Sequence, residues 1–393
     1  MSHLSKKVLC FVGYYLPGYK AGGPLKTIKN MVDHFEGDFE FSIVTQDRDL
    51  GDTNTYSSIK PNEWIKLDSS KVLYLSPDHL NVKSFAKVIN DANFDVLYLN
   101  SFFDVNFSIK PLIARRLGLI KPCPVVLAPR GEFSKGALAL KPFKKKLYMK
   151  LANWFGLYTN ITWQASSELE KIDILNALNV DPASIFIAKD LPEKKSRLAN
   201  VQNNQVFSEV RLVFLSRISP KKNLDFALRV LSNVKNSLIF DIYGPIEDEA
   251  YWQACLKLIN ALPEHIKVNY CDAVNPEQVS DIFSQYDLFF FPTRGENYGH
   301  VIAESLSVGT PVLLSDQTPW LNLSNHDLGW DLALDSEKLF VDKIEQVLDM
   351  NVAERVHWRT NVMKNAVLRI NCDADVADNK ALFEFALNRF EKR

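Results

Sequence analysis

One stretch of the sequence decides the fold: Tyr286-Asp-Leu-Phe-Phe-Phe-Pro-Thr-Arg-Gly-Glu296-Asn-Tyr-Gly-His-Val-Ile-Ala-Glu304-Ser-Leu-Ser-Val-Gly309-Thr-Pro311-Val-Leu-Leu-Ser315. The four apolar residues Leu288 to Phe291, ended by Pro and Gly, are typical of a parallel strand that is covered on both faces. A polar loop follows, and a helix begins near Tyr298 or Gly299. Gly309-Thr-Pro311 then leads into another strand. This succession of strand, loop, helix and strand predicts an α/β sheet.

The same alternation continues on both sides of this stretch. Repeated β-α units predict parallel sheets with helices on both faces. Residues 189–209 are polar and aperiodic, so they are the best candidate for a connection between domains. We expect strands at 7–13, 39–45, 72–75, 95–100, 124–128, 161–164, 185–188, 211–216, 238–243, 267–270, 288–291 and 312–315. We expect helices near 25–36, 82–92, 104–118, 141–157, 167–178, 222–234, 248–261, 276–285, 299–308 and 336–349.

These elements divide the chain into a doubly wound, Rossmann-like domain at 1–190, a linker at 191–208 and a second such domain at 209–370. At 393 residues the chain is long enough for two domains that each bury a core. The remaining residues 371–393 have apolar positions at helical spacing. Sheets of this kind bind ligands at the carboxyl ends of their strands, so we place the candidate site residues there.

Glu296 and Glu304 are eight residues apart, one in the loop before a helix and one about a turn and a half inside it. A ligand that lies across this helix N-terminus would meet both carboxylates. The free N–H groups around Asn297 to Val301 would point at an anionic group between them. The geometry suits a molecule with hydroxyl-rich ends and a phosphate middle, such as a nucleotide sugar. The alternative is a capping Glu followed by a solvated helical Glu.

Two cations, Arg217 and Lys222, lie between a strand and a helix in Arg-Ile-Ser-Pro-Lys-Lys. Arg supplies a planar fork and Lys a compact charge. Cations that hold a departing diphosphate more tightly as its bond breaks lower the barrier of the reaction. The alternative is a proline-containing turn with a solvated lysine.

Three segments of the first half also follow predicted strands. Gly22 and Gly23 precede a helix, and their lack of a side chain lets the backbone approach a phosphate closely; the alternative is a plain turn. Asn100 ends one central strand, and Pro-Arg130-Gly-Glu132 ends the next. Arg130 is a candidate for an acceptor phosphate and Glu132 for an acceptor hydroxyl. The alternative is an internal Arg–Glu pair that fixes the loop.

Composition excludes several classes of protein. Hydrophobic residues make up 47% and charged residues 24% of the chain, as in a globular protein. No run approaches the ~20 apolar residues of a membrane span, and the N-terminus lacks the apolar core of a signal peptide. The five cysteines are odd in number and scattered, which favours reduced thiols in the cytoplasm and argues against a zinc site.

Charge is unevenly distributed although the net charge is −1. Residues 1–190 hold 24 Lys and Arg against 19 Asp and Glu, whereas residues 191–393 hold 22 against 28. Residues 110–150 contain eleven basic residues and a single acidic one, which suggests an anionic partner or a membrane surface near the first domain. Within 141–155 a helix would carry Phe143, Leu147, Leu151 and Trp154 on one face. Such a helix can lie on an anionic membrane or pack into a core with a solvated basic side.

Taken together, the segments at 217–222 and 286–315, with Ala-Gly-Gly-Pro, Asn-Ser-Phe-Phe and Pro-Arg-Gly-Glu, resemble the retaining GT-B glycosyltransferases of family 4, in particular those of bacterial surface polysaccharides. The resemblance implies two domains facing a central cleft, with the final helix 371–393 crossing back to the first. It implies transfer of a sugar from a UDP- or GDP-sugar to a glycan or lipid-linked acceptor in polysaccharide, lipopolysaccharide or O-antigen synthesis. Two positions depart from the family: Asn223 replaces a frequent Gly, and Pro-Arg-Gly-Glu replaces a segment with His.

The resemblance also assigns roles to residues. Glu304 would bind the ribose hydroxyls and Glu296 the sugar hydroxyls, while the cations and the helix amides hold the diphosphate. No metal or other cofactor and no nucleic-acid partner are expected, and the protein would be cytoplasmic, at the inner face of the membrane if 141–155 binds it. A sugar-nucleotide 2-epimerase of the same fold and a non-catalytic nucleotide-sugar or glycan-binding protein are the alternatives. The expected catalytic residues are Arg217, Lys222 and Glu296; the donor-binding residues are Gly22, Gly23, Asn297, Tyr298, Gly299, His300, Val301 and Glu304; the acceptor-side residues are Asn100, Arg130 and Glu132.

Overall fold

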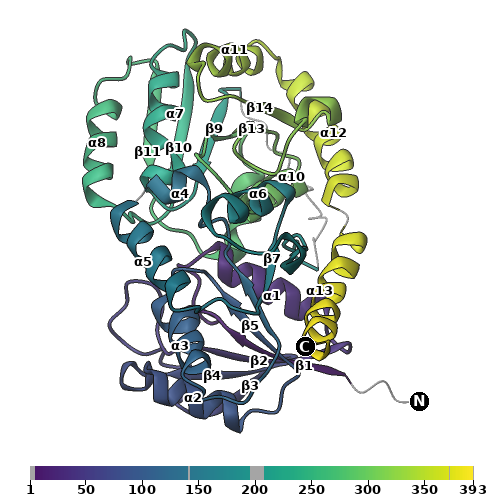
Figure 1. The fold of residues 1–393 in the computed structure, drawn as a ribbon. Coiled ribbons are helices and arrows are strands. Elements are labelled where there is room, and N and C mark those ends of the chain that lie inside the picture. Colours follow the sequence, from purple (N-terminus) through teal and green to yellow (C-terminus); the bar gives the residue numbers. More distant parts are fainter. Residues whose placement is uncertain (1–4, 140–141, 195–207, 371, 393) are drawn as a thin grey trace. The chain divides into compact units, whose positions relative to one another are not determined.

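The computed structural model describes residues 5–139, 142–194, 208–370 and 372–392. These residues form two compact units: the first combines the described part of 5–194 with 372–392, and the second comprises 208–370. Each unit is an α/β layer structure with helices on both faces of one sheet (Figure 1). Most of the predicted linker, 195–207, lies outside the described residues.

The sheet of the first unit has eight strands in the order β3-β4-β2-β1-β5-β6-β7-β8. All neighbours run parallel except β3, which pairs antiparallel with β4 at the edge. The central strands are apolar and buried on both faces, which is what parallel strands covered by helices require. The strand bounds are β1 Lys6–Phe11, β2 Phe39–Gln46, β3 Trp64–Leu67, β4 Ser70–Leu75, β5 Val96–Asn100, β6 Val125–Ala128, β7 Thr162–Ala165 and β8 Ile185–Ile187.

Two layers of helices cover this sheet, each with its own apolar core. Helices α1 (Gly23–His34) and α13 (Asp373–Glu391) share one face, and in Figure 1 the yellow α13 lies beside the purple β1 and α1. Helices α2 (Val82–Asp91), α3 (Lys110–Arg116), α5 (Pro142–Trp154) and α6 (Glu168–Ala177) share the other face, and the short helix α4 (Lys135–Ala139) precedes α5. The final helix of the chain therefore completes the core of the first unit.

The second unit has six parallel strands in the order β11-β10-β9-β12-β13-β14. Their bounds are β9 Arg211–Leu215, β10 Leu238–Tyr243, β11 Ile266–Tyr270, β12 Leu288–Phe291, β13 Val312–Ser315 and β14 Gly329–Leu332. Packing contacts group α7 (Leu224–Leu231), α8 (Glu249–Ile259) and α11 (Glu337–Leu348) in one layer. They group α9 (Val279–Phe283), α10 (His300–Ser307) and α12 (Val352–Ile370) in another.

The strand order of each sheet determines where a ligand can bind. In the first unit the order reverses between β1 and β5, and in the second between β9 and β12. At such a switch point the loops at the carboxyl ends of two neighbouring strands lead away in opposite directions and leave a crevice. The predicted site residues of the second unit follow β9 and β12, and those of the first follow β1, β5 and β6.

The predicted elements agree with the structure in type but are incomplete. Strands 238–243, 288–291 and 312–315 have the predicted bounds, whereas β3, β14, α4 and α12 were not predicted. The predicted helix 104–118 is a π-helical turn at Val105–Ile109 followed by α3. Short 3₁₀ turns lie at Pro77–His79, Pro182–Ser184, Pro220–Lys222, Pro276–Gln278 and Leu323–His326. The five cysteines form no disulfide. In the described part of the chain, no helix combines the length and apolar character of a membrane span.

Candidate active site

The loops that follow β9, β12 and β13 are joined by backbone hydrogen bonds at one edge of the second sheet. The Arg294 amide donates to the carbonyl of Lys221 at 2.9 Å, and the Glu296 amide donates to the carbonyl of Gln317 at 3.1 Å. The Ser315 hydroxyl adds a bond to the carbonyl that precedes Arg294. These bonds fix the segment with the two cations against the segment with the first glutamate.

Asn223 turns the chain from the Pro220–Lys222 turn into α7. Its φ of 64° lies in the left-handed region, which only Gly, and less often Asn or Asp, adopts readily. Its Nδ2 donates to the carbonyl of Pro292 at 2.8 Å, and its Oδ1 accepts from Arg294 Nε at 2.9 Å. Asn223 therefore adopts the left-handed turn that a glycine would also allow, and its side chain adds two contacts to the β12 loop.

The backbone of Gly244 packs closely against that of Ser216, the residue before Arg217, and so helps to position Arg217. A Cβ on Gly244, which has a φ of 137°, would lie 1.9 Å from the carbonyl oxygen of Ser216, so only glycine fits there. The Arg217 guanidinium donates to Glu247 Oε1 at 2.9 Å, and its side chain is one-third exposed. One fork of the guanidinium is thus held by the protein while the side chain stays in contact with solvent.

Lys222 and Glu296 form an ion pair between the two loops. Each side chain is only 13% exposed. The Lys222 ammonium also lies 5.5 Å from the centre of the Phe291 ring, and the Thr293 hydroxyl donates to Glu296 Oε1 at 3.3 Å. Two of the three residues predicted as catalytic are therefore in direct contact, and Arg217 is on the same loop as Lys222.

The electrostatics of this pair indicate a positive site. Burial lowers the pKa of Lys222, and Lys221 and Arg217 lower it further against the attraction of Glu296. Burial alone raises the pKa of Glu296, but Lys222, Lys221 and Arg217 outweigh it, so the pKa is lowered. Lys221 and Arg217 lower the pKa of both groups, so these two cations add positive potential at the pair. Such a site attracts an anion.

The N-terminus of α10 lies next to Glu296 in the sequence and continues this positive region. Gly299, with a φ of 80°, precedes the first residue of the helix, and no side chain caps the helix N-terminus. Trp320 Nε1 donates to the carbonyl of Tyr298 at 2.6 Å, and the Tyr298 ring lies 4.8 Å from that of His300. The helix begins at His300, slightly later than predicted, which leaves Glu304 in its second turn. The N–H groups of the first turn are suited to an anionic ligand.

Helix α1 of the first unit, like α10 of the second, has an N-terminus without a side-chain cap. Gly22 has a φ of 68°, and α1 begins at Gly23 without a side-chain cap. A Cβ added to either glycine would meet no protein atom within 4 Å. Packing against the protein therefore does not explain the absence of side chains here, and the space in front of α1 is open to a ligand.

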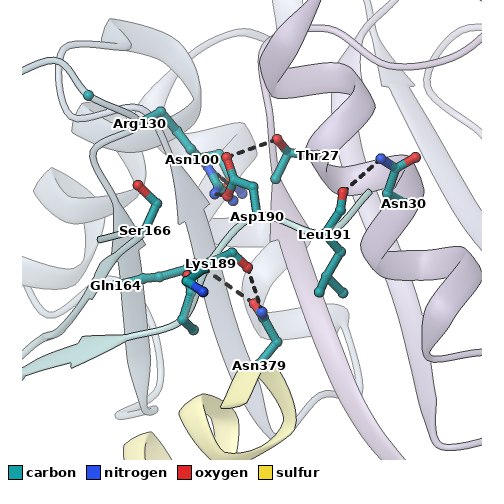
Figure 2. A network of polar contacts seen from close by, with 12 residues as sticks. Thr27, Asn30, Asn100, Arg130, Gln164, Ser166, Lys189, Asp190, Leu191 and Asn379 are labelled. Carbon is teal, nitrogen blue, oxygen red and sulfur yellow. Dashed lines mark hydrogen bonds and ion pairs between the residues drawn. The ribbon is translucent and has the colours of Figure 1, made fainter. Parts of the chain in front are cut away.

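Arg130 lies in a buried polar network of the first unit (Figure 2). Its guanidinium forms an ion pair with Asp190, and the two side chains are 6% and 3% exposed. Arg130 Nη2 also donates to Asn100 Oδ1 at 2.7 Å, and the Thr27 hydroxyl of α1 donates to Asp190 at 3.3 Å. The sequence offered an internal pair of Arg130 with Glu132 as the alternative, but Arg130 pairs with Asp190 instead.

Glu132 instead holds the loop after β5. Its carboxylate accepts from the Ser101 hydroxyl at 2.7 Å and from the amides of Phe102 and Phe103 at 2.6 and 2.9 Å. Burial raises its pKa. Asn100, Arg130 and Glu132 thus form internal hydrogen bonds at the carboxyl edge of the sheet, and their contact with an acceptor stays a prediction.

Sequence reasoning missed residues that shape both sites: Lys221, Thr293 and Trp320 in the second unit and Asp190 in the first. Lys221 is adjacent to Lys222, which was predicted. Asp190 follows the predicted strand 185–188, and this position at the carboxyl edge of the sheet could have identified it. Nothing in the sequence around Trp320 indicates its bond to the β12 loop. Within the described residues, no group of three or more His, Cys, Asp and Glu side chains is arranged to hold a metal ion.

Comparison with known proteins assigns a class to this geometry. Residues 200–365 match the model of the family described as glycosyl transferases group 1. This match covers most of the second unit, including Arg217, Lys222 and the segment from Glu296 to Glu304.

Solved structures match nearly the whole chain at low identity. HepE from Anabaena in complex with UDP-glucose has a TM-score of 0.67 at 16% identity, covering 96% of this chain and 98% of that chain. Sucrose-phosphate synthase from Thermosynechococcus elongatus has a TM-score of 0.69 at 12% identity with the same coverage. WaaG, a glycosyltransferase involved in lipopolysaccharide biosynthesis, has a TM-score of 0.60 at 14% identity, covering 96% and 98%.

A curated relative is an uncharacterized 41.2 kDa protein in the cps region of Klebsiella pneumoniae, 23% identical over 243 residues. The match covers 58% of this chain and spans 62% of the length of that relative. The chain thus has the GT-B fold of glycosyltransferases, and its second unit has the sequence features of the group 1 enzymes.

Proposed function

We propose that this chain is a retaining glycosyltransferase of the family 4 type that transfers a sugar from a UDP- or GDP-sugar to a glycan or lipid-linked acceptor. The observation that carries the proposal is the buried Lys222–Glu296 pair in a positive site next to the N-terminus of α10. A nucleoside diphosphate sugar offers two phosphate charges for the cations and hydroxyls for the carboxylates.

Different residues would bind different parts of the donor. Arg217, Lys222 and the amides from Asn297 to Val301 bind the diphosphate, Glu304 binds the ribose hydroxyls and Glu296 the sugar hydroxyls. The bond between the anomeric carbon and the diphosphate breaks while the acceptor oxygen bonds to that carbon on the same face. The acceptor proton passes to the departing phosphate oxygen, and the cations stabilise the charge that develops there.

The acceptor and the pathway rest on the comparisons. A cps-region relative and a lipopolysaccharide enzyme of the same fold support a cell-surface polysaccharide or lipopolysaccharide acceptor. Gly22 and Gly23 would bind the donor, and Asn100, Arg130 and Glu132 at the carboxyl edge of the first sheet would face the acceptor. We further propose that the reaction needs no divalent metal, because cations and helix amides supply the positive charge, and that it takes place on the cytoplasmic side.

A donor screen with the Lys222→Ala variant tests the proposal. Release of UDP or GDP from a panel of their sugars, with lipid-linked acceptors present, should identify the donor. Lys222→Ala should lower kcat by about 10²–10³-fold, because removing one group that stabilises a developing charge costs about 3–4 kcal/mol. Lys257→Ala, at an exposed lysine of α8, is the matched control and should retain full turnover.

The possible outcomes separate the proposal from its alternatives. A binding protein would bind nucleotide sugar without releasing nucleotide, and a 2-epimerase would interconvert the sugar without an acceptor. Turnover that survives in Lys222→Ala would contradict the leaving-group role. The anomeric configuration of the product, read by nuclear magnetic resonance, tests retention, and unchanged turnover in a chelator tests metal independence.

A further inference from the structure

Helix α5 presents an apolar face to solvent. Phe143, Leu147, Leu151 and Trp154 are 79%, 49%, 44% and 78% exposed. Their spacing of four, four and three residues places them on one side of a helix. Ala152 is the one buried residue among those described in α5. An exposed stripe of this size is typical of a surface that binds a partner or a membrane.

The opposite side of α5 fixes the helix to the first unit. Tyr148 packs against Phe102 and Phe103 with ring centres 5.7 and 5.9 Å apart. Lys145 Nζ donates to the carbonyl of Ala137 at 2.7 Å and lies 4.8 Å from the centre of the Phe103 ring. The side of α5 with Tyr148 and Lys145 therefore packs against the core, as one of the two alternatives predicted. The four large apolar residues lie on the other side of the helix.

The surroundings of this face are strongly basic. Residues 133–167 contain six lysines and no Asp or Glu. Lys144, Lys146 and Lys150 flank the apolar stripe and are exposed, and no ion pair within the described residues involves them. Phe155, 58% exposed, extends the apolar region beyond the end of the helix. The face thus combines apolar insertion with cations at its rim.

We propose that α5 binds the surface of a membrane that contains anionic phospholipids. Apolar residues would enter the boundary between headgroups and acyl chains while the lysines contact phosphates, as interfacial helices do. A second copy of this chain is a poor occupant, because two such helices would bring lysines together without acidic partners. The link to a lipid-linked acceptor rests on the proposed function, whereas membrane binding itself can be measured without turnover.

The first experiment measures binding of the full chain to vesicles by flotation. Vesicles of phosphatidylcholine mixed with phosphatidylglycerol should retain the protein, and those of phosphatidylcholine alone should retain far less. Added salt should weaken binding, because it screens the lysines. Equal binding to both kinds of vesicle, or to neither, would overturn the proposal.

Two variants test the helix directly. Phe143→Ser with Trp154→Ser should lose binding through the apolar contact. Lys144→Gln with Lys146→Gln and Lys150→Gln should weaken it by about 100-fold, since each lysine near an anionic surface contributes about fivefold. The controls are Leu368→Ser, at an 80% exposed leucine of α12, and the combined Lys257→Gln, Lys338→Gln and Lys364→Gln, which remove exposed lysines elsewhere. These controls should bind like the original protein, and thermal unfolding checks that all variants fold.

The remaining outcomes distinguish this inference from the proposed function. If the α5 variants bind vesicles normally, the proposal is wrong even when the protein itself binds. If they dissociate an oligomer in analytical ultracentrifugation instead, a second copy covers the helix. Absence of vesicle binding with intact nucleotide release would remove the membrane proposal alone. If the protein binds vesicles but releases nucleotide from no donor, the membrane proposal is supported and the proposed glycosyltransferase activity is contradicted.

Discussion

Burying Lys222 and Glu296 removes two charges from water, and the free-energy cost of this desolvation can exceed the gain from their mutual attraction. Replacing a buried ion pair by apolar residues of similar volume is often neutral or stabilising by about 1–4 kcal/mol, so stability is a weak reason for such a pair. A ligand provides a better reason. A diphosphate between these loops would compete for Lys222 and release Glu296 toward the sugar hydroxyls.

If a nucleoside diphosphate binds at Lys222 as proposed, the lowered pKa of Lys222 should make its binding depend on pH. An anion stabilises the protonated ammonium, so the Kd of the nucleoside diphosphate should rise as the pH increases through the pKa of Lys222 in the free protein. That pKa lies below the ordinary lysine value of about 10.4. Calorimetric titration with UDP or GDP from about pH 7 to 10 measures this dependence.

Lys222→Arg is the control for this titration, because its guanidinium stays charged throughout. Its Kd should be nearly independent of pH, and equal slopes in both proteins would rule out Lys222 as the group that titrates. Stability should change in the opposite sense. The pKa of Lys222 is lower in the folded chain than in the unfolded chain. Between these two pKa values the unfolded chain binds more protons, so the free energy of unfolding should increase as the pH rises through this range.

The sequence predicted individual site residues better than their partners. Arg217, Lys222 and Glu296 could be singled out because charge and position after a strand coincide. The pairing of Lys222 with Glu296 depends on β9 and β12 being neighbours, which the sequence does not specify. Arg130 likewise pairs with Asp190, 60 positions away, because β6, β7 and β8 are consecutive in the sheet.

At the scale of elements, α1 connects a candidate ligand site to the core of the first unit. Its first residue faces open space, while Ile28, Met31 and Val32 are buried against the sheet. The helix is thus held rigidly, and its free N–H groups have a fixed direction. Preorganised donors of this kind need no rearrangement when an anion binds.

Gly23→Ala separates ligand binding from folding at this helix. The new Cβ meets no protein atom within 4 Å and the backbone of Gly23 is not left-handed, so the free energy of unfolding should stay unchanged or rise by about 0.4–1 kcal/mol. If a substrate approaches this backbone closely, kcat/KM should nevertheless fall by about 10–100-fold, as expected for a small misplacement of a reacting group. Urea unfolding and steady-state kinetics measure the two effects, and unchanged kinetics would place the substrate elsewhere.

Strand bounds were predicted more closely than helix bounds, and α12, which was not predicted, shows one reason. A run such as Leu288 to Phe291 is apolar at every position because both of its faces are covered. The buried stripe of α12 instead includes Arg355 and Arg359, which are 2% and 1% exposed. Arg355 pairs with Asp287 at 3.0 Å, and Arg359 donates to the carbonyl of Ser284 at 2.7 Å. Two arginines in the buried stripe conceal the apolar period on which helix prediction depends.

For the whole molecule, the important feature is that the chain enters the second unit and then returns to the first. Helix α13 supplies Leu382, Phe383 and Ala386 to the core of the first unit. The sequence predicted two α/β units because their β-α repeats are clear on both sides of a polar segment. It did not specify the strand order, which depends on pairing between distant segments.

Phe383→Ala should destabilise the first unit and leave the second unaffected. The Phe383 ring lies 5.4–6.4 Å from the ring centres of Phe35, Phe39, Phe41 and Tyr98. Removing a buried aromatic ring costs about 3–5 kcal/mol. Calorimetry should show one unfolding transition at lower temperature and a second unchanged. Leu368→Ala, at an exposed leucine of α12, is the control, and a shift of both transitions would contradict separate cores.

His34, at the end of α1, contacts both points where the chain crosses between units. Its Nε2 lies 3.0 Å from the carbonyl oxygen of Pro192 and 3.9 Å from the sulfur of Cys372. Residues 195–371 are in this sense an insertion whose two attachment points adjoin one side chain. A few glycines and serines joining residue 194 to residue 372 would therefore span the gap, and the shortened polypeptide should fold by itself as a single-domain protein. If the second unit binds the donor as proposed, exchanging it for that of a relative should change the donor and keep the acceptor.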